Sequence, residues 1–300
     1  MTEEEFKKVI KNERKAFMST FNVIHQVFIQ LGLDNKDPEY FINNASKIVE
    51  DIRSRVWKTY LELEEEFSNY LYKKLIPDNV DEKLPRKAVE DYIDENTNNF
   101  YTLSLSNTQS RRSRAGKEFE AIISHLFIGA NIPFDEQGLI GTGVFKDKNL
   151  AKLVDHVIPG AIEYGISKRN VVALTAKTTL RERWQEIGDE LDRTRMSEIY
   201  LATVDEEIGE NTLDQLRANN IYPVTTATLK EKYYKDNNLV LTFEDFLQLA
   251  KDVSNTWTKD KYSDDDIKFK ITNLKKAINN TSEEYIIEYL QKRIIELENF

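Results

Sequence analysis

A lysine follows directly after an apolar run in the segment from Val171 to Arg193. The run is typical of a strand covered on both faces, because branched apolar side chains suit a buried pleated surface: Val171, Val172, Leu174 and Thr175. Lys177 stands at the end of this predicted strand. A helix is predicted next, since Thr178 or Thr179 can cap it and apolar residues recur at helical spacing at Trp184, Ile187 and Leu191.

Two acidic residues can meet Lys177 at one edge of the sheet. Asp155 lies in a second short apolar run, Lys152–Ile158, which we expect to pair with the first run as a hairpin or a neighbouring strand. Glu190 flanks the buried stripe of the predicted helix and can lean back toward the strand ends. Two carboxylates and one ammonium suit phosphodiester hydrolysis, because hard oxygen ligands hold Mg²⁺ and the ammonium stabilises developing negative charge.

Three charged side chains fan out from the first turn of the same helix: Arg181, Glu182 and Arg183. An arginine fork pairs with O6 and N7 of guanine, and a carboxylate accepts from the amino group of cytosine. The triplet is therefore suited to reading G·C base pairs. A solvated first turn, with a glutamate that favours the helix dipole, is the alternative.

The segment Lys177–Trp184, KTTLRERW, resembles the type II restriction endonucleases of the SsoII, EcoRII and PspGI group, within the PD-(D/E)XK nuclease superfamily. In that group, the acidic residue that usually lies two positions before the lysine has moved to the next helix. Here Thr175 occupies the vacated place and Glu190 the new one. The resemblance implies that Asp155 and Glu190 are metal ligands and that Lys177 orients the water and the scissile phosphate. It also implies that the CC/GG base pairs are read by Arg181, Glu182 and Arg183.

A second stretch that resembles the group is Gln109–Glu120, QSRRSRAGKEFE. The resemblance implies that Glu120 belongs to the active-site cluster, as a further metal ligand or as a partner of one. It implies also that Gln109 supplements base recognition. The stretch contains a basic run that suits phosphate contacts along a duplex, or else an ordinary solvated helix face: Arg111, Arg112, Arg114 and Lys117.

A third stretch, Ile52–Lys58, reads IRSRVWK and lies on a predicted long helix. Arg53 and Trp57 are four residues apart, so they share one helix face. A guanidinium and an indole held in parallel form a slot for a nucleobase, and stacking there can offset the cost of extruding the base. The resemblance implies that this pair sandwiches the flipped central nucleotides; an intrahelical cation-π pair or a half-buried tryptophan is the alternative.

The composition limits the class of function. A net charge of −10 argues against a general nucleic-acid coat, which would be basic, but it is compatible with a specific reader whose basic groups converge on one cleft. The chain has no cysteine, no run of membrane-spanning length and no signal peptide, so we expect a cytoplasmic protein without membrane contacts. No chemistry is assigned to the three histidines, His25, His125 and His156.

The predicted fold class is α/β, with a PD-(D/E)XK restriction-endonuclease-like core whose mixed central sheet is flanked by helices. Residues 1–100 are expected to form an N-terminal helical subdomain for DNA, base-flipping and dimer contacts, with helices near 3–31, 38–74 and 86–95. Residues 101–254 are expected to form the catalytic and recognition core, with strands near 198–204 and 221–225 and helices near 211–218 and 242–250. A C-terminal helical extension, 255–300, is predicted to contain helices 265–278 and 282–297, the second capped by Thr281 and Glu284.

These features predict a Mg²⁺-dependent enzyme that cuts double-stranded DNA at a palindrome with a CC-N-GG core and flips its central nucleotides. A palindrome has a two-fold axis, so a homodimer is expected in which each subunit cuts one strand. The resemblance implies cleavage before the first C, a 5′ phosphate, and a cognate DNA methyltransferase that is a functional counterpart but not a bound partner. Two alternatives stay open: a repair or recombination nuclease of the same superfamily, and a non-catalytic DNA-binding protein.

Overall fold

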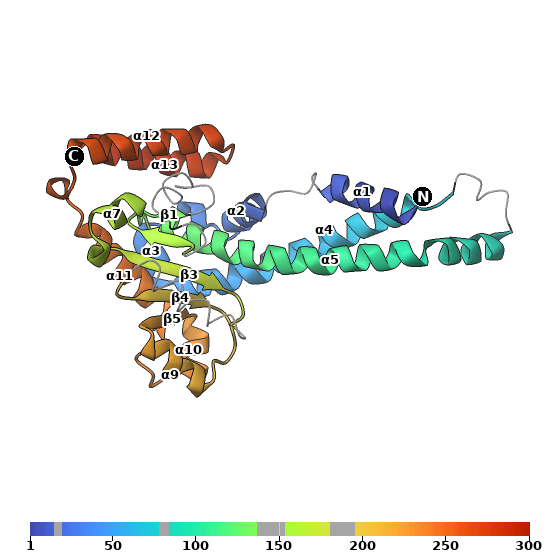
Figure 1. Ribbon diagram of the computed structural model, residues 1–300, viewed down its shortest axis with the longest axis horizontal. Helices are drawn as coiled ribbons and strands as arrows, with labels where there is room; N and C mark the ends of the chain where they lie inside the picture. Colours follow the sequence, from blue (N-terminus) through green and yellow to red (C-terminus); the bar gives the residue numbers. More distant parts are fainter. Residues whose placement is uncertain (15–19, 78–83, 137–149, 151–153, 181–195) are drawn as a thin grey trace.

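The computed structural model describes residues 1–14, 20–77, 84–136, 150, 154–180 and 196–300. A mixed sheet lies within its globular part, on the left in Figure 1. Within these residues, six strands follow one another across the sheet in chain order: β1 Asp135–Glu136, β2 His156–Ile158, β3 Val172–Lys177, β4 Ile199–Thr203, β5 Ile221–Thr225 and β6 Leu241–Thr242. The first three strands pair antiparallel, and β3 to β6 pair parallel. The predicted α/β class with a mixed sheet is confirmed.

The central strand β3 is covered on both faces. Leu174 and Ala176 pack into the larger apolar cluster and Ala173 into a second one, because successive strand side chains point to opposite faces. Lys177 is the one residue of β3 that is not fully buried. The expected pairing of β2 with β3 is confirmed, and it places His156 opposite Leu174.

Helices pack on each side of the sheet. The larger cluster receives side chains from α2 Thr20–Gln30, α3 Pro38–Asn43, α4 Ala45–Lys73, α5 Pro85–Gly129, α11 Phe243–Asn255, α12 Asp264–Asn280 and α13 Glu284–Glu298. The second cluster receives them from α7 Ala161–Ile166 and α9 Glu210–Ala218. Four short elements also lie among the described residues: α10 Ala227–Tyr233 and the 3-10 turns η1 Leu33–Asn35, η3 Lys168–Asn170 and η4 Lys259–Lys261.

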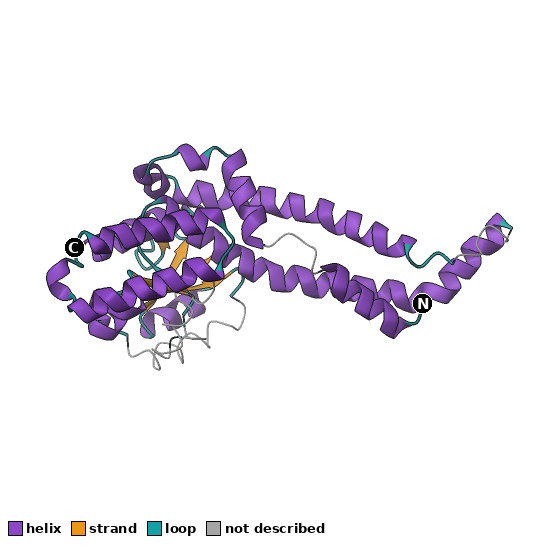
Figure 2. Cartoon of the chain, turned by 90° about the horizontal axis from the view of Figure 1, so that it is seen from above, coloured by secondary structure: helices purple, strands orange, loops and turns teal. Residues whose placement is uncertain are grey.

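The helices α4 and α5 extend away from the sheet as an arm, and α1 Glu3–Arg14 packs against it (Figures 1 and 2). A third apolar cluster holds the arm together: Phe6, Ile10, Phe67, Leu71, Leu75 and Leu103. The short helix expected near residues 86–95 is wrong, because α5 continues without a break for 45 residues. At 1.5 Å per residue it is about 67 Å long. The predicted boundary at residue 100 therefore lies inside a helix.

Two other predicted helices differ from the structure. The one over 38–74 is interrupted at Asn44, which ends α3 and begins α4. The one over 3–31 corresponds to α1 and α2, which join different apolar clusters. Part of the predicted N-terminal subdomain thus belongs to the apolar cluster that covers one face of the sheet.

The C-terminal helices lie nearly at their predicted bounds, but one predicted cap is wrong. The capping box lies at the start of α12, between Ser263 and Asp266. At the start of α13, Glu283 occupies the cap position without a side-chain bond to the helix. Within the described residues, the helices are too short or too polar to cross a lipid bilayer.

Candidate active site

The end of β3 brings Asp155 and Lys177 to the same edge of the sheet. Asp155 immediately precedes β2, and its backbone N–H donates to the Leu174 carbonyl at 3.0 Å. Its carboxylate oxygen Oδ2 accepts from the Ala176 N–H at 2.7 Å and from the Thr175 hydroxyl at 3.2 Å. Two donors on β3 therefore orient this carboxylate toward the strand end that carries Lys177.

Glu120 approaches the same edge from α5. Burial, and then the neighbouring Asp155 carboxylate, raise the pKa of Glu120 to about 7, while His156 and Lys177 act in the opposite direction. Charges influence a pKa strongly only at short range, so the Glu120 carboxylate lies near the charged groups of Asp155 and Lys177. The structure thus brings together three of the four predicted catalytic residues.

A buried polar network lies behind Glu120, and no sequence pattern indicates it. The Ser124 hydroxyl donates to Glu136 Oε2 at 2.7 Å and lies 3.0 Å from His156 Nε2. Ser124 is one helical turn after Glu120, and Glu136 ends β1. The network therefore links α5 to β1 and β2, the elements next to the two carboxylates.

The fourth predicted catalytic residue, Glu190, lies outside the described residues. The predicted base readers do as well: Arg181, Glu182 and Arg183. The residue before them, Leu180, is buried, and its N–H donates to Asp205 Oδ2 at 2.8 Å. Asp205, which sequence reasoning missed, thus holds the start of the segment that carries the readers.

Arg53 and Trp57 line one cavity of about 610 Å³ between α4, α5 and the end of β3. Thr178, Thr179 and Asp205 line it from the sheet side. The Trp57 side chain is 44% exposed, and its ring stacks on Tyr60 at a centroid distance of 5.9 Å. The Arg53 guanidinium lies 6.0 Å from the ring centre of Phe119. The cavity therefore opens beside the strand end that bears Lys177.

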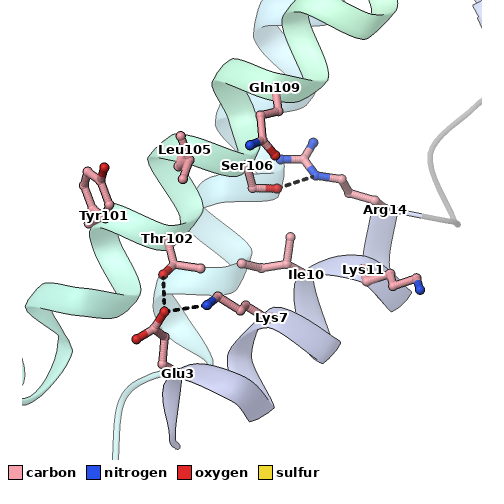
Figure 3. A pocket seen from close by; sticks show the side chains of 10 residues that line it. All are labelled: Glu3, Lys7, Ile10, Lys11, Arg14, Tyr101, Thr102, Leu105, Ser106 and Gln109. Carbon is pink, nitrogen blue, oxygen red and sulfur yellow. Dashed lines mark hydrogen bonds and ion pairs between the residues drawn. The ribbon is translucent and has the colours of Figure 1, made fainter.

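The predicted phosphate contacts have different surroundings. Arg111 pairs with Glu64, and Arg114 pairs with Glu118 while lying 4.7 Å over the Tyr60 ring. The Arg114 side chain is only 12% exposed, so binding a phosphate would require it to leave Glu118. Arg112 and Lys117 are exposed on α5. Gln109 is also exposed, and it lines a separate groove between α1 and α5 (Figure 3).

The donor set at the end of β3 fits a hard divalent cation. Carboxylate oxygens are the ligands that such ions prefer, and two carboxylates forced together in a buried place gain from a cation between them. Burial is the main cause of the raised pKa of Glu120, and the Asp155 carboxylate raises it further. Among the described residues, no three or more His, Cys, Asp or Glu form a cluster that could hold a metal ion. Glu190 lies outside the described residues.

A mixed sheet flanked by helices, with an acidic residue and a lysine at one strand edge, is the architecture of the PD-(D/E)XK nucleases. The chain is a type II restriction enzyme of this class, a site-specific deoxyribonuclease. The model of the family described as EcoRII C terminal matches residues 73–247, which is more than half of the 300-residue chain, and the chain belongs to that family. The resemblance inferred from KTTLRERW is confirmed.

Two curated relatives support this assignment. The type II restriction enzyme SsoII of Shigella sonnei is 42% identical over 293 residues, which cover 97% of this chain and 96% of SsoII. The type II restriction enzyme EcoRII of Escherichia coli is 30% identical over 139 residues, which cover 45% of this chain and 32% of EcoRII.

Solved structures agree with the sequence relatives. Metal-depleted Ecl18kI in complex with uncleaved, modified DNA superposes with a TM-score of 0.90 at 41% identity, covering 99% of this chain and all of that one. The restriction endonuclease PspGI in its substrate DNA complex superposes with a TM-score of 0.56 at 17% identity, covering 80% of this chain and 95% of PspGI, and supports the fold alone.

Proposed function

We propose that this restriction endonuclease is Mg²⁺-dependent and acts as a homodimer on double-stranded DNA at a palindrome with a CC-N-GG core. One observation carries the proposal. Asp155, Lys177 and Glu120 converge at one strand end, on a chain that is 42% identical to a type II restriction enzyme over nearly its full length. Divalent metal use follows from this relationship, and magnesium is the ion that we propose.

Asp155 and Glu120 would hold the ion, together with Glu190. When bound, the ion polarises the scissile phosphate and activates a water molecule. Asp155 keeps one orientation because the Ala176 N–H and the Thr175 hydroxyl both donate to its Oδ2. Lys177 places an ammonium at the same strand end, where it stabilises the negative charge that grows on the phosphate as the bond breaks.

We propose that base reading and base flipping take place next to each other. The readers Arg181, Glu182 and Arg183 follow Leu180 in the chain, and the Asp205 that binds Leu180 also lines the cavity of Arg53 and Trp57. We propose that the flipped central nucleotide enters this cavity and stacks on the Trp57 indole. The exposure of that indole supports the assignment, since a ring buried in the core could not receive a base.

Digestion of a sequenced phage DNA with Mg²⁺, followed by sequencing of the fragment ends, tests the proposal. Discrete fragments are expected, cut before the first C of CC-N-GG and carrying 5′ phosphates. A smear without a common end sequence would indicate a repair or recombination nuclease. A duplex that is shifted in a gel but never nicked, with any divalent metal, would indicate a non-catalytic DNA-binding protein.

A further inference from the structure

A groove of about 630 Å³ runs between α1 and α5 on the arm, away from the sheet. Figure 3 shows Gln109 and Arg14 at one end of the groove and Glu3 with Thr102 at the other. The helix α1 is held there by Phe6 and Ile10, which are buried in the third apolar cluster. The groove is therefore built by packed helices.

The Arg14 guanidinium is fixed by neutral groups, and the Glu64 carboxylate acts on it only through space. Its Nε donates to the Ser106 hydroxyl at 3.3 Å, a terminal nitrogen donates to the Asn107 side-chain oxygen, and its carbon Cζ lies 4.6 Å over the Phe67 ring. Among the residues that the structure describes, Arg14 forms no salt bridge. The nearby carboxylates of Glu13 and Glu64 are bound by Lys74 and Arg111 instead. A guanidinium held by neutral acceptors is ready to bind an anion.

The groove shares one face of α5 with the active site. Gln109 and Glu120 are eleven residues apart, which is about three helical turns, so the two side chains leave the helix in the same direction about 16 Å apart. From Gln109 the groove continues along α5 to Tyr101, away from Glu120. That extension is about 12 Å, the length of three to four base pairs.

The side chains that line the groove carry a net positive charge, whereas the whole chain carries a net negative charge. The charged lining residues of the groove are Lys7, Lys11, Arg14 and Glu3, whereas the whole chain has 42 basic and 52 acidic residues. Glu3 is already bound by Lys7 at 2.6 Å. We propose that the groove binds backbone phosphates of duplex DNA outside the recognised base pairs, with Arg14 as the principal contact and Lys11 as a second. This inference rests on the proposed function.

Two duplexes with the same CC-N-GG core test the inference, one with about 2 flanking base pairs on each side and one with about 10, so that only the second reaches along the groove. Binding is measured by fluorescence anisotropy in EDTA, which keeps the DNA uncut. Arg14→Gln is expected to weaken binding to the long duplex about tenfold and to leave the short duplex unchanged. The slope of log K against log salt is expected to decrease by about 0.9 for each phosphate that the variant no longer neutralises.

Lys11→Gln provides a second variant, because this exposed side chain can be replaced without disturbing the packing of α1. This variant is expected to reduce the affinity for the long duplex less than Arg14→Gln does, and to leave the affinity for the short duplex unchanged. Lys8→Gln is the matched control, since Lys8 is exposed on the same helix but does not line the groove. Equal weakening on both duplexes, or no weakening with either groove variant, would overturn the inference. If the wild-type protein does not prefer CC-N-GG over a scrambled core, the proposed function fails and the inference fails with it.

Discussion

The carboxylate of Asp155 is oriented by the strand that carries the lysine. In the commoner superfamily pattern, the position two before the lysine holds an acid, whereas Thr175 here is buried and donates to Asp155. A hydroxyl at that position adds a hydrogen bond without adding a third buried negative charge. Thr175 therefore donates a hydrogen bond to Asp155 at the position where the commoner pattern places an acid.

Lys177→Ala and Asp155→Ala are expected to bind the proposed CC-N-GG duplex and to cut it at least about a hundredfold more slowly, because in the proposed mechanism each removes a charge that would act at the scissile phosphate. Single-turnover cleavage and gel-shift measurements on the same duplex separate the two effects. Arg169→Ala is the control, since Arg169 is an exposed basic residue shortly before β3. Full-rate cleavage by the Lys177 variant would remove this mechanism.

Trp57→Ala is expected to prevent base flipping while leaving the fold intact, because the indole is 44% exposed. Removing the stacking on one base weakens DNA binding by about 1–3 kcal/mol. With 2-aminopurine at the central position, the wild-type protein should increase the fluorescence and the variant should not. Leu61→Ala serves as the control, one turn further along α4 and 37% exposed. An unchanged fluorescence increase in the tryptophan variant would contradict the stacking role.

Sequence reasoning found the site residues that lie close to a recognisable pattern. The meeting of Asp155 with the end of β3 followed from two short apolar runs and a turn, and the placement of Glu120 followed from the family resemblance. Ser124, Glu136 and Asp205 were missed, because their partners are on elements that are distant in sequence. Such contacts depend on how helices cross the sheet, which no local pattern encodes.

At the scale of elements, β2 to β5 were predicted, whereas the two-residue strands β1 and β6 and the long helix α5 were not. The strand β5 has its predicted bounds, since a buried strand produces a dense apolar run. In α5, Leu103 is the only apolar residue buried between Asn96 and Glu118, so the helical periodicity disappears there. That part of α5 packs against the helices α1 and α4 and not against the sheet. It therefore buries few apolar side chains.

The C-terminal helix α12 is anchored to α7 by a buried ion pair. Lys270 of α12 binds Glu163 of α7, and the Tyr262 hydroxyl donates to the same carboxylate oxygen at 2.6 Å. Glu163 is completely buried. The pair thus joins the predicted C-terminal extension to the second apolar cluster.

Lys270→Ala is expected to lower the free energy of unfolding by about 3–5 kcal/mol, because it leaves Glu163 charged and buried without a cation. Urea unfolding followed by circular dichroism measures the change. Lys268→Ala, two residues earlier and exposed, should change little. Combining Lys270→Met with Glu163→Gln should cost less than the sum of the two single changes. Additive effects would show that the two side chains are not coupled.

At the scale of the whole molecule, stability is expected to depend on Asp135, which lies beside this anchor. Burial, assisted by Glu163, raises the pKa of Asp135 from 3.8 to about 6, while Lys270 and the Ala161 N–H oppose the shift. Between these pH values, the folded protein keeps a proton that the unfolded chain has released. Raising the pH through this window therefore removes stability.

Thermal unfolding from pH 4 to pH 8 measures this effect. The melting temperature of Asp135→Asn minus that of the wild type is expected to rise up to about pH 6 and then to level off. Asp236→Asn, at an exposed position, should give a curve parallel to the wild type. A curve for Asp135→Asn that stays parallel to the wild type over the whole range would contradict the assignment.

The continuity of α5 sets a rule for its length. Adding or deleting one residue between Gln109 and Glu120 would swing one side chain about 100° around the helix axis relative to the other and shift it by about 1.5 Å. Insertions of about seven or eleven residues would keep the two side chains on one helix face but would move them about 10 Å or about 16 Å further apart, so they would not preserve the spacing. The helix thus fixes the distance between Gln109 and Glu120. Relatives that keep both the groove and the candidate active site are expected to align between these two positions without gaps.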